Sequence, residues 1–409
     1  MSLSLKQEFE NMLTKESRLA IELSADNAMI FGVDIYLIGG IVRDFIMHNK
    51  IKDIDIAVEG DAIEFAEFLS SKVRCRIIQI QENLKTAKII FPSGVEIDFA
   101  STREEIYTGS GILPKAHNFG CNLKNDVKRR DFTINTLAIK LTDNKKYELV
   151  DYFGGYQDIL NKKIKILHEK SFIDDPSRII RALKFKERFD FEIDEKTYNL
   201  MLQYLKIPDK NMPLERIKSE VKQYFSIDKE DIYERFIESE SYKLFCDNPV
   251  QVINKSRLNE IKTLNIPEKP DIRFIYFVCL VINSDYTSLR FNLTAREIKI
   301  INQVREFLFC NTEKQDNLQI YKSYKDADNQ AVLIYYLLSG DKNVIKFLSE
   351  LKNTEILTTG KDLIELGFKP SKSFSDIFDL ILKEKLDGKL KTKEEETVFI
   401  KNNIKKESE

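Results

Sequence analysis

The sequence of 409 residues contains no tryptophan, only three histidines and only five cysteines. The cysteines are scattered, odd in number and without a C-x-x-C pair, which argues against a disulfide framework or a cysteine zinc site and indicates reduced thiols. Three histidines are too few to build a His-Asp phosphohydrolase centre. No apolar run approaches the length of a membrane span, and the first residues lack the apolar core of a signal peptide. We therefore expect a cytoplasmic protein without a membrane partner.

An excess of charge of one sign is missing as well. Lys and Arg number 64 against 66 Asp and Glu, so the formal net charge is −2. This balance excludes a globally basic nucleic-acid binder, and any nucleic-acid surface must be a local patch. With 43% apolar and 32% charged residues, the composition favours a soluble, folded chain that is long enough for three or four modules.

The most informative segment is Leu37-Ile-Gly-Gly-Ile-Val-Arg-Asp44, followed by Lys52-Asp-Ile-Asp-Ile-Ala-Val58. Apolar residues before Gly39 predict a strand, those after the glycine pair predict a helix, and the glycines let backbone N–H groups approach an anion. The later alternation predicts a strand with Asp53 and Asp55 on one face. A lone D-x-D is more often a turn or a solvated edge. A phosphate cradle directly upstream instead favours Mg²⁺ ligands for nucleoside triphosphate chemistry.

A third carboxylate is expected from a neighbouring strand. Val95-Glu-Ile-Asp-Phe-Ala100 alternates in the same way and places Glu96 and Asp98 on one face. We favour Asp98, with Glu96 as the alternative. Together with the pair at 53 and 55 it would complete the carboxylate trio that holds two metal ions in nucleotidyl transfer.

Six ordered motifs between about residues 30 and 225 resemble those of the class II tRNA nucleotidyltransferase and bacterial poly(A) polymerase family of the DNA polymerase beta superfamily. They are Leu37 to Val58, Tyr107 to Pro114, Arg129-Arg-Asp-Phe-Thr-Ile-Asn135, Val150-Asp-Tyr-Phe-Gly-Gly-Tyr-Gln-Asp158, Asp174-Asp-Pro-Ser-Arg-Ile-Ile-Arg181, and Glu215-Arg216 with Glu220. Six motifs in one order are far more specific than any one of them.

The resemblance implies an α+β fold. A nucleotidyltransferase head, with a small mixed β-sheet flanked by helices, would be followed by all-α neck, body and tail domains. We place the head at residues 1–140, the neck with a base-selecting helix at 141–225, the body at 226–320 and a tRNA-contacting tail at 321–409.

The resemblance also implies roles for individual residues beyond the carboxylates. The triphosphate would be bound by Gly39, Gly40 and Arg43, the ribose by Asp131 and Asn135, and the base by Asp175 and Arg178. Arg130 would bind the triphosphate or the acceptor end, and Arg181, on the basic face of the base-selecting helix, would bind the nucleotide or the tRNA backbone.

The base-selecting pair has a physical rationale. Asp175 and Arg178 stand at i and i+3 on a helix whose first turn carries a proline, so their side chains can lie side by side. CTP and ATP both present an amino donor beside an unprotonated ring nitrogen, which a carboxylate and a guanidinium can read. UTP and GTP present the reverse pattern and would be rejected. The alternative is that Asp175 is a helix cap and Arg178 its salt-bridge partner.

Together these features predict an enzyme that adds C, A or both to the 3′ end of tRNA from CTP and ATP, with Mg²⁺ as cofactor and pyrophosphate as product. We expect a monomer or a weak homodimer. The alternatives are a poly(A) polymerase and a non-catalytic RNA-binding relative. Because no arginine follows Arg305, the arginine-rich extension of many poly(A) polymerases is missing, and intact Asp53 and Asp55 argue against a non-catalytic protein.

Overall fold

The structure is a computed structural model that describes residues 2–51, 53–109, 111–112, 114–143, 147–207, 214–266, 268–285, 289, 292–309, 315–370 and 373–404. Three residues of the predicted motifs, Lys52, Ser110 and Leu113, lie outside these ranges. The chain divides into two compact units, unit 1 (Met1–Ile227) and unit 2 (Asp228–Glu409). Unit 1 contains a mixed sheet, and the described part of unit 2 is helical, which confirms the α+β prediction. The finer four-part division stays a prediction.

A seven-stranded mixed sheet forms the centre of unit 1, in the order β3-β4-β5-β2-β1-β8-β9. Strands β2 and β5 pair in parallel, and the other neighbours pair antiparallel. The strands are β1 (Asp34–Ile38), β2 (Asp55–Glu59), β3 (Arg76–Gln81), β4 (Thr86–Ile90), β5 (Glu96–Ser101), β8 (Ala138–Lys140) and β9 (Leu149–Val150). The sheet therefore brings segments about 100 residues apart in sequence side by side.

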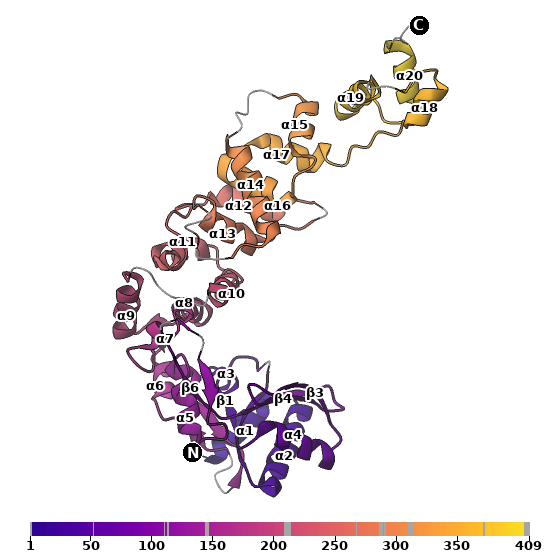
Figure 1. The fold of residues 1–409 in the computed structure, drawn as a ribbon. Helices are drawn as coiled ribbons and strands as arrows, with labels where there is room; N and C mark the ends of the chain where they lie inside the picture. Colours follow the sequence, from indigo (N-terminus) through magenta and orange to yellow (C-terminus); the bar gives the residue numbers. More distant parts are fainter. Residues whose placement is uncertain are drawn as a thin grey trace. The chain divides into compact units, whose positions relative to one another are not determined.

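One face of this sheet is apolar and covered by helices (Figure 1). Helices α2 (Lys15–Phe31) and α4 (Ala62–Lys72) pack on it, and Phe65 of α4 meets the fully buried Phe99 of β5 edge to face. Because side chains alternate along a strand, the residues next to Phe99, including Asp98, point to the opposite face.

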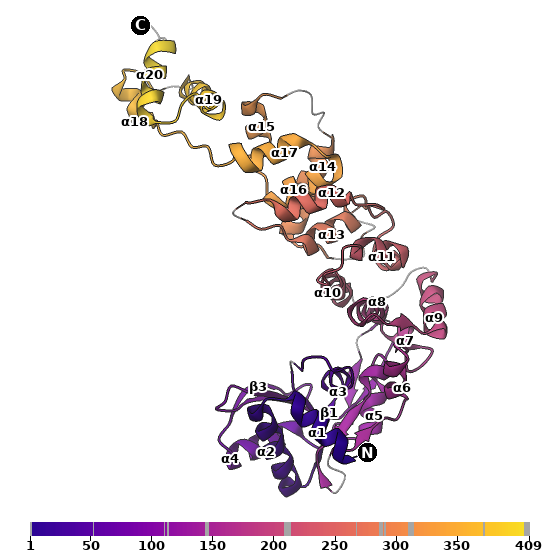
Figure 2. The ribbon, with the colours of Figure 1, turned by 180° about the vertical axis from the view of Figure 1, so that it is seen from behind.

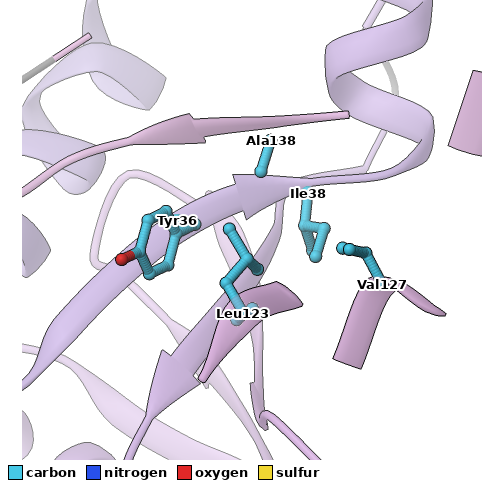
Figure 3. Packing of buried hydrophobic residues seen from close by; sticks show 6 residues of the cluster. Tyr36, Ile38, Leu123, Val127 and Ala138 are labelled. Atoms are coloured by element: carbon cyan, nitrogen blue, oxygen red, sulfur yellow. The ribbon is translucent and has the colours of Figure 1, made fainter. Parts of the chain in front are cut away.

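The opposite face is closed at its β1–β8 end by α5 (Leu123–Lys128). Figure 3 shows Leu123 and Val127 of this helix packing against Tyr36, Ile38 and Ala138 of the sheet. Burial of such side chains stabilises the fold by roughly 1.5 to 3 kcal/mol each. The helix leaves the β2, β5 and β4 part of this face available for a site.

The remaining elements of unit 1 lie outside this sheet. They are α1 (Ser2–Met12), α3 (Gly40–Ile46), β6 (Glu104–Ile106), β7 (Lys115–His117), η1 (Thr133–Asn135), α6 (Gly155–Leu160), β10 (Lys163–Ile164), α7 (Ser171–Asp174), α8 (Ser177–Phe189), β11 (Glu192–Ile193), α9 (Glu195–Leu205) and α10 (Leu214–Tyr224). Helix α8 packs on α10. The predicted all-α neck also contains the short parallel pair β10–β11.

Unit 2 is a helical array whose successive helices are visible in Figure 2. They are α11 (Ile232–Glu238), η3 (Ser241–Leu244), α12 (Lys255–Thr263), α13 (Ile272–Val281), α14 (Ala295–Phe309), α15 (Asn317–Tyr324), α16 (Asn329–Ser339), α17 (Lys342–Lys346), η4 (Phe347–Leu351), α18 (Gly360–Glu365), α19 (Ser373–Leu386) and α20 (Lys393–Asn403). The last three helices share a small core around Leu363, Ile381 and Ile400. Of the helices in the described ranges, none is long and apolar enough to cross a membrane.

Candidate active site

Two of the predicted carboxylates face one cavity. Asp55 begins β2, Asp98 lies in β5, and the parallel register pairs them directly. Both line a cavity of about 440 Å³, as do Gly40 and Arg130. Asp53 precedes β2 by two residues and is exposed. The structure therefore brings the first glycine motif, the D-x-D segment and the third-acid strand together.

Like charges crowd this cavity. Asp55, like Asp53, is solvent-exposed. Desolvation by the surrounding protein atoms and the nearby carboxylate of Asp98 nevertheless raise the pKa of Asp55, and Asp53 adds to the effect. Lys88 of β4 partly compensates, because its Nζ lies 3.0 Å from Asp98 Oδ2 and 3.5 Å from Glu96. In the described residues no three Cys, His, Asp or Glu side chains already converge as a metal cluster. The repulsion between the carboxylates nevertheless fits a divalent cation, which would relieve it.

The glycine turn before α3 places Arg130 at the cavity. Gly39 has φ +73°, and a Cβ there would lie 2.6 Å from Arg130 Nη1, so a larger residue would displace the guanidinium. The N–H of Gly39 donates to Leu137 O at 3.0 Å, and Gly40 is the member of the pair that lines the cavity. Arg130 makes long hydrogen bonds of 3.4 and 3.5 Å, and its buried Nε has no partner among the described residues. Its donors are suited to an anion.

A second group of predicted residues forms a closed network. Asp131 accepts from Arg181 Nε at 2.8 Å and Nη2 at 2.6 Å, and from Asn135 Nδ2 at 2.9 Å. Burial by itself would raise the pKa of Asp131, but Arg181 and Asn135 outweigh it and lower that pKa to about 2. Arg181 also donates to Glu220 of α10 at 2.9 Å. The network thus ties the sheet region to α8 and α10.

Arg43 belongs to this network and not to the carboxylate cavity. Its Nη1 donates to Asn135 Oδ1 at 2.6 Å, and its Nε and Nη2 donate to Asp44. The guanidinium also lies 4.6 Å from the ring centroid of Phe189. Because the side chain is buried and its partners are all internal, contact with a triphosphate would need an exchange of partners.

The predicted base-selecting pair is buried and side by side. Arg178 Nε lies 3.9 Å from Asp175 Oδ2. Asp175 accepts from the N–H and hydroxyl of Ser177 and pairs with Arg216 Nη1 at 3.0 Å. Arg178 donates to Ser171, to the Tyr107 hydroxyl and to the carbonyl of residue 129. Asp175 therefore does bond to the first turn of α8, as the cap alternative expects, and is held by α10 as well.

Several groups around these residues were not predicted from the sequence. Lys88, Thr86 and Gln79 of the β3–β4 hairpin line the carboxylate cavity. Arg216 belongs to the sixth motif, but its contact with Asp175 was not predicted. The hairpin matches no motif, although its alternation predicts Thr86 and Lys88 on one face. The position of Lys88 opposite Asp98 depends on strand register, which local alternation does not determine.

Comparisons with known proteins agree with this geometry. Residues 35–165 match the poly A polymerase head domain family. The chain is 31% identical to the A-adding tRNA nucleotidyltransferase of Geobacter sulfurreducens, over 88% of this chain and 44% of that protein. It is 27% identical to the A-adding tRNA nucleotidyltransferase of Halalkalibacterium halodurans, over 95% of this chain and 92% of that protein. The chain thus spans less than half the length of the first relative and nearly all of the second.

Solved structures extend the likeness over the whole chain. The fold matches an apo CCA-adding enzyme with a TM-score of 0.81 and 26% identity, covering 98% of this chain and 99% of that one. It matches the Thermotoga maritima CCA-adding enzyme complexed with tRNA with a TM-score of 0.76 and 26% identity, covering 98% of both. The chain is therefore similar to tRNA nucleotidyltransferases over nearly its whole length and to the poly A polymerase head domain over residues 35–165.

Nucleotidyltransferases in general use a divalent metal. In this chain Asp55 and Asp98, with Asp53 nearby, are carboxylates that could hold one. Relatives in complex with ATP and with CTP share the fold, at TM-scores of 0.78 and 0.77 and with 27% and 26% identity. They cover 98% and 97% of this chain.

Proposed function

We propose that this chain is a tRNA nucleotidyltransferase that adds C, A or both to tRNA 3′ ends from CTP and ATP. The observation that carries the proposal is the direct pairing of Asp55 with Asp98 in a cavity that Gly40 and Arg130 also line. The names of the curated relatives and the complexes of the structural relatives with tRNA, ATP and CTP support the substrate class.

The reaction joins the acceptor 3′ oxygen to the α-phosphorus of the nucleotide. The bond between the α-phosphorus and the bridging oxygen of the β-phosphate breaks, pyrophosphate leaves, and the hydroxyl proton is lost to solvent. Mg²⁺ held by Asp53, Asp55 and Asp98 would supply stabilisation of the charge that develops on these oxygens. Arg130, whose internal hydrogen bonds are long, would donate to the triphosphate.

Asp175 and Arg178 would read the base with the hydrogen-bonding capacity they have left. The described bonds of Arg178 use three of the five N–H groups of a guanidinium. Those of Asp175 occupy three of about four lone-pair positions of its carboxylate. One acceptor and at least one donor therefore suit an amino group beside an unprotonated ring nitrogen. Asp131 and Asn135 would contact the ribose, which requires a shared or exchanged hydrogen bond within their network.

A poly(A) polymerase is the second candidate, because the matched head-domain family carries that name. The names of the curated relatives favour tRNA. We further propose a cytoplasmic monomer or weak homodimer, in keeping with the four free cysteines that the structure describes.

The test uses tRNA transcripts that lack the whole C-C-A end, its last two nucleotides or only the final A. Each is incubated with Mg²⁺ and with CTP, ATP, UTP or GTP alone, and products are resolved on sequencing gels. Addition that stops at the C-C-A end supports the proposal and shows which steps this chain performs. Long A tracts on unrelated RNA would support the poly(A) alternative, and binding without extension would support the non-catalytic one.

A further inference from the structure

The polar side of the sheet continues beyond the carboxylates. Lys88 of β4 lies opposite Asp98 in the antiparallel β4–β5 register, and Gln79 of β3 lies opposite Lys88. Thr86 and Gln81 form the adjacent row. All of these side chains line the same cavity as the carboxylates. They form a shelf, defined as Gln79, Gln81, Thr86 and Lys88, to which the function proposed above assigns no task.

The sheet order determines which reactant can lie on this shelf. Gly40 and Arg130, the groups suited to the triphosphate, lie toward β1, and the shelf lies toward the β3 edge, with β2 and β5 between them. The attacking and leaving oxygens lie roughly in line across the phosphorus in nucleotidyl transfer. If pyrophosphate leaves on the β1 side, the acceptor strand must therefore approach across β4 and β3.

The charge of Lys88 fits that approach. Strands β3, β4 and β5 supply several of the described residues that line the cavity. Lys88 is the one positively charged residue among them. Its ammonium now pairs with Asp98 at 3.0 Å and Glu96 at 3.5 Å. A divalent cation on Asp98 would repel the ammonium, which would keep the exposed Glu96 as a partner and would be free to bind a second anion. The other shelf residues are neutral hydrogen-bonding side chains that compete little for an anion.

We propose that Lys88 binds a backbone phosphate at the 3′ end of the acceptor RNA and thereby positions the attacking hydroxyl beside Asp98. This inference rests on the nucleotidyltransferase function proposed above. Lys88 would thus have two successive partners. It pairs with the carboxylate of Asp98 in the free protein and with the RNA phosphate when metal and RNA are bound. The ligand class is a single-stranded ribonucleotide end, since a lone ammonium recognises phosphate without reading a base.

The experiment measures RNA binding without chemistry. A tRNA acceptor minihelix that ends in C-C is labelled at its 5′ end, and its affinity is followed by fluorescence anisotropy from 50 to 300 mM salt, in Ca²⁺ and without nucleotide. In Lys88→Gln we expect about three- to tenfold weaker binding and a slope of log affinity against log salt that is smaller by about 0.7, as for one lost single-strand phosphate contact. Lys88→Arg should retain most of the affinity.

Lys85→Gln is the matched control on the same hairpin. Lys85 pairs with Asp61 at 3.1 Å and Glu82 at 3.5 Å, and Asp61 caps α4 on the opposite face of the sheet. We expect wild-type affinity and slope for this variant. Unchanged affinity and slope in Lys88→Gln, together with an altered Ca²⁺ affinity, would overturn the proposal and leave Lys88 a partner of Asp98 alone. Failure of the wild-type protein to transfer any nucleotide would instead refute the proposed function.

Discussion

The carboxylate cavity and the Asp131 network lie in the same unit, yet their acids are in opposite electrostatic states. Asp55 is solvent-exposed but lies beside Asp98 and Asp53, and partial desolvation together with these like charges raises its pKa. Asp131 faces Arg181 and Asn135, which lower its pKa to about 2. Repelling carboxylates such as those of the cavity are typical of a site that binds a cation. The carboxylate of Asp131, in contrast, is already neutralised by protein side chains. The comparison predicts that substitutions in the cavity affect chemistry and those in the network affect stability.

The largest effect is expected from Asp55→Asn. Loss of a carboxylate that holds metal should lower the transfer rate about a thousandfold or more, because the metal stabilises charge that forms in the transition state. The melting temperature should stay equal or rise slightly, since the substitution removes repulsion with Asp98. Single-turnover kinetics and a melting curve on the same preparation measure both quantities.

The two acids of β5 provide the control. Asp98→Asn should approach the defect of Asp55→Asn, while Glu96→Gln should retain most activity because Asp98 is the acid that lines the cavity opposite Asp55. The reverse ranking would move the third-acid role to Glu96. Near-normal turnover in Asp55→Asn would remove the cavity from the mechanism altogether.

Base selection should show the next largest effect. Substitution of Asp175 is expected to affect both the reaction and the stability of the fold. Loss of one charge-assisted hydrogen bond to the base costs roughly 1.5 to 3 kcal/mol, so Asp175→Ala should lose about one to two decades of preference for CTP over UTP. Its bonds to Ser177 and Arg216 are lost too, so the melting temperature should fall.

Competition between CTP and UTP on one primer, beside melting curves, separates these contributions. Arg216→Gln is the informative partner variant, since it removes a support of Asp175 at 3.0 Å without removing the proposed reader itself. It should lower stability and leave most of the preference intact. If Asp175→Ala lowers only the melting temperature, the residue is structural and the base-reading proposal fails.

The network gives a smaller effect, which depends on pH. A folded-state pKa of about 2 against an ordinary value of 3.8 corresponds to about 2 kcal/mol of stability at neutral pH. Because the folded pKa is depressed, this contribution is present above about pH 4 and is lost as pH falls through about 2. Asp131→Asn should therefore be less stable than wild type by about 2 kcal/mol at pH 7, and the difference should narrow below pH 4.

Urea unfolding at pH 7, 5, 4 and 3 follows that difference. Asp44→Asn is a useful comparison, because Asp44 pairs with Arg43 at 2.9 Å at the edge of the same network. A stability difference between wild type and Asp131→Asn that stays constant from pH 7 to pH 3 would show that ionisation of Asp131 does not contribute as the pKa indicates.

The sequence predicts well those features that depend on neighbours along the chain. The strand before Gly39 and the helix after Gly40 follow from local alternation and from glycine. The predicted second strand is present, but it begins at Asp55 and leaves Asp53 outside it.

Asp175 and Arg178 lie close together as predicted, but α8 begins at Ser177 and Asp175 is extended. The prediction that both residues stand on one helix is therefore wrong, because the helix begins only after Pro176. The structure confirms the strand before Gly39 and the helix after it, and the roles of the residues stay predictions.

Contacts between segments that are distant in sequence could not be predicted from the local pattern of apolar and polar residues. Whether Asp98 or Glu96 faces Asp55 depends on the register of the parallel β2–β5 pair, whose strands are joined through α4, β3 and β4. The enclosure of Arg43 by Asn135 and Phe189, 92 and 146 residues away, could not be read from its own motif. Such partners decide whether a predicted binding residue is open to a ligand or already engaged.

The smallest effect is expected from Lys184→Met, at the far side of the network. Lys184 Nζ lies 2.5 Å from Glu220 and 2.8 Å from Gln223, yet burial lowers the pKa of Lys184 despite the pairing with Glu220. Desolvation thus outweighs the attraction, and Glu220 keeps Arg181 as a partner at 2.9 Å. A methionine of similar length should therefore change the free energy of unfolding by less than about 1 kcal/mol. Arg181→Met removes a hydrogen-bond donor from both Asp131 and Glu220. It should lower the free energy of unfolding clearly more than Lys184→Met does in the same urea titration. Equal losses in the two variants would mean that the network is held by Lys184 as much as by Arg181.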